Sequence, residues 1–298
     1  MAPPLSLMIA QLAFLILSVP HKSTSAWMPL PLVSKQLKGA GFTGGEGGQW
    51  PRSIASDAAG QFLVIGIDVG GIYRSFDSGR SWEPTNVGYS PRGSGCVAID
   101  PKNPKRVLSV GVNSSPIPQN GLYLSEDQAG SWRVVLPVDM GGDEHRDQLA
   151  FDPSSFDPKL KETRRIFWSR IAKDKPHWGP EKTLGGLFVS QDGGRVWKEA
   201  EGQKELGGKI LKFCSSGRFF YAGGEEGLWK VNAATLAKQK ILEGPVTGLD
   251  ASTKRPGCLW VSQAESIKFS TDYGSNWKQL NVKSLLRPGC TLRGVKAS

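Results

Sequence analysis

The chain has 298 residues, of which 39% are hydrophobic and 21% charged, and its formal net charge is +10. This length and hydrophobic content suffice for the core of one large domain and exclude a disordered tail. Glycine and proline are abundant, at 37 and 20 residues, and no long stretch has a period of 3.6 residues. The composition therefore favours an all-β fold of many short strands joined by turns.

The first 26 residues are typical of a secretory signal peptide. An apolar run over 5–19 is followed by the small residues Thr24–Ala26, which suit cleavage by signal peptidase. An uncleaved anchor and an organelle-targeting segment are the alternatives. We expect a secreted chain with one domain over 27–298 and no membrane span after cleavage.

The cysteines and one asparagine carry further expectations. Four cysteines, Cys96, Cys214, Cys258 and Cys290, allow three pairings in an oxidising compartment. Cys258 and Cys290 flank one structural unit and are the expected disulfide. No C-x-x-C occurs, so neither a zinc or redox site nor any cofactor is expected. Asn113 opens an Asn-Ser-Ser sequon, which predicts a glycosylation site if the chain is secreted.

The motif S-x-D-x-G-x-x-W recurs along the chain. Near-copies occur at 75–82, 125–132, 190–197 and 270–277, and the second has Ala129 at the glycine position. Each follows a short run typical of a β-strand, namely GIYRS, GLYLS, GLFVS and SIKFS. A fifth run, GLWKV, has no motif after it. A repeated strand and turn indicate a repeat architecture.

Local physics gives each residue of this motif a structural role. The aspartate accepts hydrogen bonds from backbone N–H groups in the turn, and the glycine supplies a positive φ. The tryptophan begins the return strand and covers the hairpin with a large apolar face. We therefore predict structural rather than catalytic roles for Asp77, Asp127, Asp192 and Asp272, and core positions for Trp82, Trp132, Trp197 and Trp277.

The pattern resembles the Asp-box (BNR) repeat of β-propellers over most of residues 50–282. The resemblance implies four-stranded blades arranged radially. Each blade would have an innermost strand, a second strand, the run before the box and an outer strand. Five candidate innermost strands recur, at 52–57, 96–101, 148–153, 209–214 and 246–251.

The two ends of this pattern suggest a sixth blade. Residues 27–33 look like a lone outer strand, and residues 292–298 look like an innermost strand. Either the chain is a piece of a longer propeller, which we favour, or it is a compact small propeller whose ends pair directly.

A finer resemblance indicates a function. The segment GIDVGGIYRSFDSG (66–79) is similar to the first blade of glycoside hydrolase family 74, the xyloglucanases, which carry T-D-[IV]-G-G-x-Y-R. HRDQLAFDP (145–153) resembles that family's G-E-R-L-x-V-D-P segment, and the resemblance covers roughly residues 40–200. It implies an inverting endo-glycosidase that hydrolyses O-glycosyl bonds of β-glucan or xyloglucan. Asp68 then matches one of the two catalytic carboxylates. The alternative role for Asp68 is to cap a strand or turn.

The second carboxylate has no counterpart here. In that family it comes from a second propeller, and an inverting enzyme needs its two carboxyl groups about 6.5–9.5 Å apart. The nearest acidic cluster is Asp143, Glu144 and Asp147, beside His145. Proton transfer there and a solvated loop are the two interpretations.

Aromatic residues outside the boxes are candidates for stacking on sugars. Trp50, Tyr89 and Trp178 are predicted substrate contacts, with blade packing as the alternative. Trp168 is a further candidate, for which packing is the favoured role. The basic residues are spread along the chain, which fits an acidic glycan or cell-wall material better than nucleic acid. We expect a monomer with a polysaccharide ligand.

The sequence also bears on two other classes of propeller. A sialidase requires Arg-Ile-Pro or Arg-Val-Pro before the first box, and neither occurs. A non-catalytic propeller that binds protein or glycan, resembling a sorting receptor or a photosystem assembly factor, remains the alternative to a hydrolase.

Overall fold

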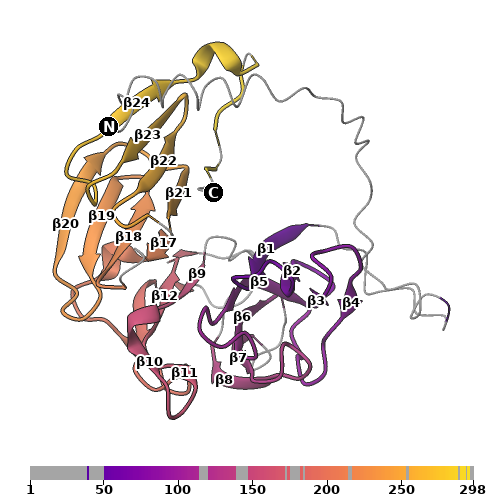
Figure 1. Cartoon of the computed structure of the whole chain (residues 1–298). Coiled ribbons are helices and arrows are strands. Elements are labelled where there is room, and N and C mark those ends of the chain that lie inside the picture. The colour runs from indigo at the N-terminus through magenta and orange to yellow at the C-terminus, as the bar shows by residue number, and fades with distance from the viewer. Residues whose placement is uncertain are drawn as a thin grey trace, which may run out of the picture. The chain divides into compact units, whose positions relative to one another are not determined.

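The computed structural model describes residues 39, 50–113, 120–138, 147–171, 173–174, 182–183, 185–213, 217–252, 255–287, 289–292 and 294–295. Within these ranges 24 strands form five four-stranded antiparallel sheets and two short hairpins. The predicted all-β propeller of four-stranded blades is confirmed (Figure 1).

Each blade is an antiparallel meander, and the blades follow one another along the chain. The first two consist of β1 (Pro51–Ser56), β2 (Leu63–Ile67), β3 (Ile72–Ser75) and β4 (Glu83–Pro84), then β5 (Gly93–Ile99), β6 (Val107–Val112), β7 (Gly121–Ser125) and β8 (Arg133–Pro137). The last two consist of β17 (Ile210–Phe213), β18 (Phe219–Gly224), β19 (Gly227–Asn232) and β20 (Lys238–Glu243), then β21 (Gly248–Ala251), β22 (Leu259–Gln263), β23 (Ser266–Ser270) and β24 (Lys278–Asn281).

The third blade carries two insertions between its strands. Its sheet consists of β9 (Gln148–Phe151), β12 (Ile166–Arg170), β15 (Gly186–Ser190) and β16 (Lys198–Glu199). The hairpins are β10 (Phe156–Asp157) with β11 (Glu162–Thr163), and β13 (Lys173–Asp174) with β14 (Lys182–Thr183). Three single-turn 3-10 helices, Pro153–Ser155, Lys204–Leu206 and Lys283–Leu285, complete the described elements.

The first strands of the blades coincide with the candidate innermost strands. Strands β1, β5, β9, β17 and β21 start the five meanders, and each of the first four contacts the first strand of the next blade. The repeated runs before the boxes, together with GLWKV, form the third strands. The order of strands within a blade is therefore the order that the repeat predicts.

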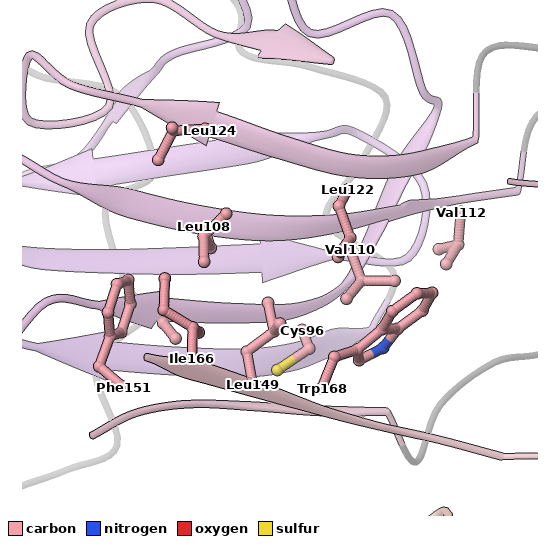
Figure 2. Close-up of a cluster of buried hydrophobic side chains, with 11 residues drawn as sticks. Cys96, Leu108, Val110, Val112, Leu122, Leu124, Leu149, Phe151, Ile166 and Trp168 are labelled. Carbon is pink, nitrogen blue, oxygen red and sulfur yellow. The ribbon is translucent and has the colours of Figure 1, made fainter. Parts of the chain in front are cut away.

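The core consists of apolar side chains packed between neighbouring blades. Figure 2 shows such a cluster between the second and third blades, with Leu108, Val110 and Leu122 facing Ile166 and Trp168. Trp168 has no exposed surface, and its Nε1 donates to Asp147 Oδ2 at 2.9 Å. Side chains alternate between the two faces of each sheet, so every blade supplies one apolar face to each neighbour.

The boxes share one hydrogen-bonding pattern, which the first box illustrates. Ser75 Oγ donates to Asp77 Oδ1 at 2.8 Å, and the same Asp77 oxygen accepts the N–H of Ser81 at 2.8 Å. Hydrogen bonds from Ser81 and then Ser75 lower the pKa of Asp77 from 3.8 to about 2. In the second box Ala129 takes the left-handed conformation of the usual glycine, with φ 61°. The contacts are those of an aspartate that closes a turn.

The two ends of the chain, where the sequence predicts a signal peptide and the strands of a sixth blade, lie largely outside the described blades. Residues 1–26 and 27–33 lie outside the described residues. Of residues 292–298, Leu292, Gly294 and Val295 are described and form no strand, although the Leu292 N–H donates to the carbonyl oxygen of Ala264 at 2.7 Å. No helix in the described ranges is long and apolar enough to cross a bilayer.

The predicted disulfide is wrong. Cys96, Cys258 and Cys290 are free thiols, and Cys214 lies outside the described residues. Cys258 directly precedes β22, a strand of five residues that spans about 17 Å. Cys290 is two residues from Leu292, which bonds to Ala264 just beyond the other end of β22. The two cysteines therefore lie at opposite ends of this strand, and a disulfide requires Cα atoms within about 7 Å.

Candidate functional site: the Asp68 loop

Asp68 lies directly after β2, at the end of the first blade where the loop to β3 begins. The loop is held against the segment that leads into the second blade. Gly70 and Gly71 both donate their N–H groups to the carbonyl oxygen of Arg92, at 2.8 and 3.0 Å. Gly71 has φ +75°, which L side chains rarely adopt, so the turn requires glycine there.

The Asp68 carboxylate accepts hydrogen bonds from several groups. Oδ1 accepts the backbone N–H of Trp50 at 3.1 Å and that of Val69 at 2.8 Å. Oδ2 forms an ion pair with Arg52 Nη2 at 3.3 Å. The residue is 4% exposed. Charge-assisted bonds of this kind fix the orientation of a carboxylate.

The backbone of Asp68 is fixed as well. Its carbonyl oxygen accepts Asn113 Nδ2 at 2.6 Å, from the end of β6 in the second blade. A Cβ added to Gly93 would lie 1.7 Å from the same oxygen, so the two backbones approach as closely as glycine allows. Nδ2 of Asn113 is also the nitrogen that would carry a sugar at the sequon. Glycosylation of Asn113 stays a prediction.

Trp50 provides an exposed aromatic face beside this carboxylate. Its side chain is 63% exposed, and Arg52 Cζ lies 5.0 Å from the centroid of its ring. The guanidinium thus contacts both the ring of Trp50 and the carboxylate of Asp68. Such an aromatic face can stack on the apolar face of a sugar ring. The structure therefore brings two of the predicted residues, Asp68 and Trp50, into one site.

The predicted substrate contact at Tyr89 is wrong. Tyr89 is 6% exposed, and its ring packs against those of Tyr123 and Trp132, at centroid distances of 4.7 and 5.5 Å. Its hydroxyl donates to the carbonyl oxygen of Gly93 at 3.1 Å and shares a hydrogen bond with Ser109 Oγ at 2.9 Å. Burial raises the pKa of Tyr89. The ring supports the segment around Gly93 and has no face free for a sugar.

The acidic cluster is only partly described. Asp143, Glu144 and His145 lie outside the described residues, as does Trp178. Asp147 is fully buried. Its two oxygens accept hydrogen bonds from Trp168 Nε1, at 2.9 Å, and from the N–H of Ile171, at 3.0 Å. Asp147 is therefore neither a solvated loop residue nor an exposed acid, and it joins the start of the third blade to the end of β12.

Sequence reasoning missed two members of the site. Arg52 lies in the candidate innermost strand at 52–57, but nothing in the sequence around it indicates that it pairs with Asp68. Asn113 drew attention only as a glycosylation sequon. Both contact Asp68 across gaps of 16 and 45 residues. In the described ranges no group of three or more His, Cys, Asp or Glu residues could hold a metal ion.

Comparison with known proteins places these observations in context. No protein-family model matches the chain. A xyloglucanase from Acetivibrio thermocellus is 27% identical over 310 residues, which covers 87% of this chain and 35% of that protein. A xyloglucanase from Paenibacillus sp. is 25% identical over 256 residues, which covers 71% of this chain and 23% of that protein. The chain thus spans only about a third or less of the length of these relatives.

Solved structures agree on the fold. A glycoside hydrolase family 74 enzyme from Niastella koreensis superposes with a TM-score of 0.59 at 16% identity, over 77% of this chain and 38% of that one. The family 74 xyloglucanase from Xanthomonas campestris gives a TM-score of 0.56 at 19% identity, with the same coverage. The chain is therefore homologous to the xyloglucanases and folds as a β-propeller like those of the family 74 glycoside hydrolases.

Proposed function

We propose that the chain is a secreted, glycoside-hydrolase-like propeller that binds a β-glucan of the xyloglucan type at the Asp68 end of its first blade. One observation carries the proposal. Trp50 is 63% exposed and presents its ring to solvent, while its backbone N–H donates a hydrogen bond to the Asp68 carboxylate at 3.1 Å. An aromatic ring that can stack therefore belongs to a residue bonded directly to a fixed carboxylate. This pair suits a polysaccharide, whose C–H faces can stack on the ring and whose hydroxyl groups can donate to the carboxylate. The xyloglucanase relatives suggest which polysaccharide to test first.

Catalysis at Asp68 is the stronger form of this proposal. In an inverting glycosidase one carboxylate activates water and a second protonates the leaving oxygen. Asp68 would be the first of these, oriented by Arg52 and by two backbone N–H groups. Its partner would be sought among residues outside the described ranges or in a further domain.

A purely binding role is the second candidate, and the burial of Asp68 favours it. The residue is 4% exposed, and both carboxylate oxygens already accept described donors. A base that activates water must reach that water within about 3 Å. In the binding role Asp68 holds Trp50 and Arg52 in place, and the ring contacts the glycan.

Binding and cleavage are tested separately. We expect the purified chain to bind soluble xyloglucan, and Trp50→Ala to weaken that affinity by about tenfold because a stacking contact is lost. Phe76→Ala is the matched control, since Phe76 is 49% exposed but follows β3, at the opposite end of the same blade. Absence of binding by the unmodified chain, or an equal loss in both variants, would refute the proposed site.

Release of reducing ends then distinguishes the two roles. If Asp68 is catalytic, Asp68→Asn abolishes release while affinity stays within about threefold. If the propeller only binds, the unmodified chain releases nothing and Asp68→Asn weakens affinity. Cleavage that survives in Asp68→Asn would contradict the catalytic role.

Secretion has a test of its own. The intact mass of the protein recovered from the medium of its source should correspond to cleavage after Ala26. The same spectrum shows whether Asn113 carries a sugar. A mass that includes residues 1–26 would contradict secretion by a cleaved signal peptide.

A further inference from the structure

A groove between the fourth and fifth blades lies away from the Asp68 loop. It has a volume of about 640 Å³ and is lined by Lys230 and residues 239–243 of the fourth blade, which include Lys240 and Glu243, and by residues 273–275 of the fifth. These residues belong to β19, to the outer strand β20 and to the box turn of the fifth blade. Box turns follow the third strand of a blade, whereas Asp68 precedes the third strand of the first blade. The two sites therefore lie at opposite ends of their blades, and the volume is typical of a small-ligand pocket.

Lys230 gives this groove its net positive charge, since the other charged lining residues, Lys240 and Glu243, form an ion pair. Its Nζ lies 4.6 Å from the ring centroid of Phe219 and 5.4 Å from that of Tyr273. Within the described part of the chain Lys230 forms no ion pair and no side-chain hydrogen bond. Cation–π contacts hold the ammonium in place, and no described residue accepts a hydrogen bond from its three N–H donors. A half-buried cation in this condition favours an anionic ligand.

The strand register sets which side chains share the groove face. Lys230 pairs directly with Gln239 across β19 and β20, so the two side chains lie on the same face. Lys240 pairs with Trp229, and its Nζ lies 5.2 Å from that ring and 3.1 Å from Glu243 Oε2. Lys240 and Glu243 also line the groove, and their charges offset each other there. Lys230 is the lining cation that has no carboxylate partner among the described residues, so it is the one available to a ligand.

The remaining lining residues suit a sugar. Ile241 and Leu242 are half-buried apolar side chains, while Gln239 and Ser275 are exposed polar groups at the rim. A pyranose has apolar C–H faces and a rim of hydroxyl groups, and a uronate adds one carboxylate. The geometry points to a second binding site, in which this groove takes a uronate residue of an acidic polysaccharide with its carboxylate on Lys230. This site goes beyond the proposed function, because xyloglucan binding at Trp50 does not depend on it.

The test uses polygalacturonate as the probe and the full chain, titrated by calorimetry at low and physiological salt. We expect Lys230→Gln to weaken the affinity by about tenfold, the value of one charge-assisted hydrogen bond. Lys278→Gln is the matched control. Lys278 lies on β24, the outer strand of the next blade, and its Nζ also sits over an aromatic ring, 5.9 Å from the Phe269 centroid. We expect it to change the affinity by less than about twofold.

Several outcomes would overturn the proposal. Equal losses in Lys230→Gln and Lys278→Gln would mean diffuse attraction to a basic protein. Poly-glutamate binding as tightly as polygalacturonate would mean that the groove recognises charge rather than sugar, and would favour an acidic protein partner. Absence of polygalacturonate binding by the unmodified chain would exclude the site. Xyloglucan affinity should not change in Lys230→Gln, so failure here is distinguishable from failure at Trp50.

Discussion

Gly93 sets the distance between the first two blades at the candidate site, and Gly93→Ala tests how tightly they are packed. The new Cβ would lie 1.7 Å from the Asp68 carbonyl oxygen, whereas Cβ contacts shorter than 3.0 Å essentially never occur. The backbones must therefore separate by at least about 1.3 Å, the difference of these two values. That shift would also strain the 2.6 Å bond from Asn113 and the 3.1 Å bond from Tyr89.

We expect Gly93→Ala to destabilise the fold by about 3 kcal/mol, at the upper end of overpacking in a tight core. For a domain of this size that corresponds to a fall in Tm of roughly 6–12 °C, measured by differential scanning calorimetry. Affinity for xyloglucan should fall as well, because Asp68 moves relative to Trp50.

The control for this experiment is Gly294→Ala. A Cβ at Gly294 meets no atom within 4 Å, so we expect a change of no more than about 0.5 kcal/mol. A Tm for Gly93→Ala within about 2 °C of the unmodified protein would refute the reasoning, since it would mean that the two segments part at little cost.

Three further predictions concern the box, the buried phenol and the thiols. The folded-state pKa of Asp77 is about 2, below its ordinary 3.8, so the ionised carboxylate stabilises the fold above about pH 4 and this stabilisation is lost as the pH falls toward 2. Asp77→Asn should therefore make the Tm fall less steeply with pH over this range, and an unchanged slope of Tm against pH would contradict this role. Tyr89→Phe should cost about 1 kcal/mol in urea unfolding because the bonds to Gly93 and Ser109 are lost, whereas equal stability would show that they contribute nothing. Cys258→Ser should leave the Tm unchanged with or without reductant; a loss of about 2 kcal/mol confined to the oxidised chain would reveal a disulfide.

The box motifs and blade order could be predicted because their interactions are local. Within a box, Asp77 bonds to groups two and four residues away, and the same spacing recurs around Asp272. A turn built from such short-range contacts leaves a fixed pattern in the sequence, and alternating apolar residues mark the strands on either side. Repetition of the pattern then implies one blade per repeat.

Contacts between blades could not be predicted, because they join residues distant in sequence. A cluster between the second and third blades illustrates this. Glu162 pairs with Arg106 at 3.0 Å and accepts hydrogen bonds from Nη1 and Nη2 of Arg195, at 2.9 and 2.7 Å. Burial acts to raise the pKa of Glu162, but the bonds from Arg195 and Arg164 and the charge of Arg106 outweigh it and lower the pKa. No local pattern announces such a cluster.

The sequence by itself determined that this chain is a β-propeller of four-stranded blades and that Asp68 precedes the third strand of the first blade. Tertiary structure alone decided what surrounds Asp68: Trp50 and Arg52 beside its carboxylate, and Asn113 and Gly93 against its backbone. It also decided that Tyr89 is buried and that Cys258 and Cys290 are unpaired. The physical reason is that turns are closed by residues near in sequence. The burial of a side chain and the partner it bonds to depend instead on which blade packs against which, and only the packed sheets determine this.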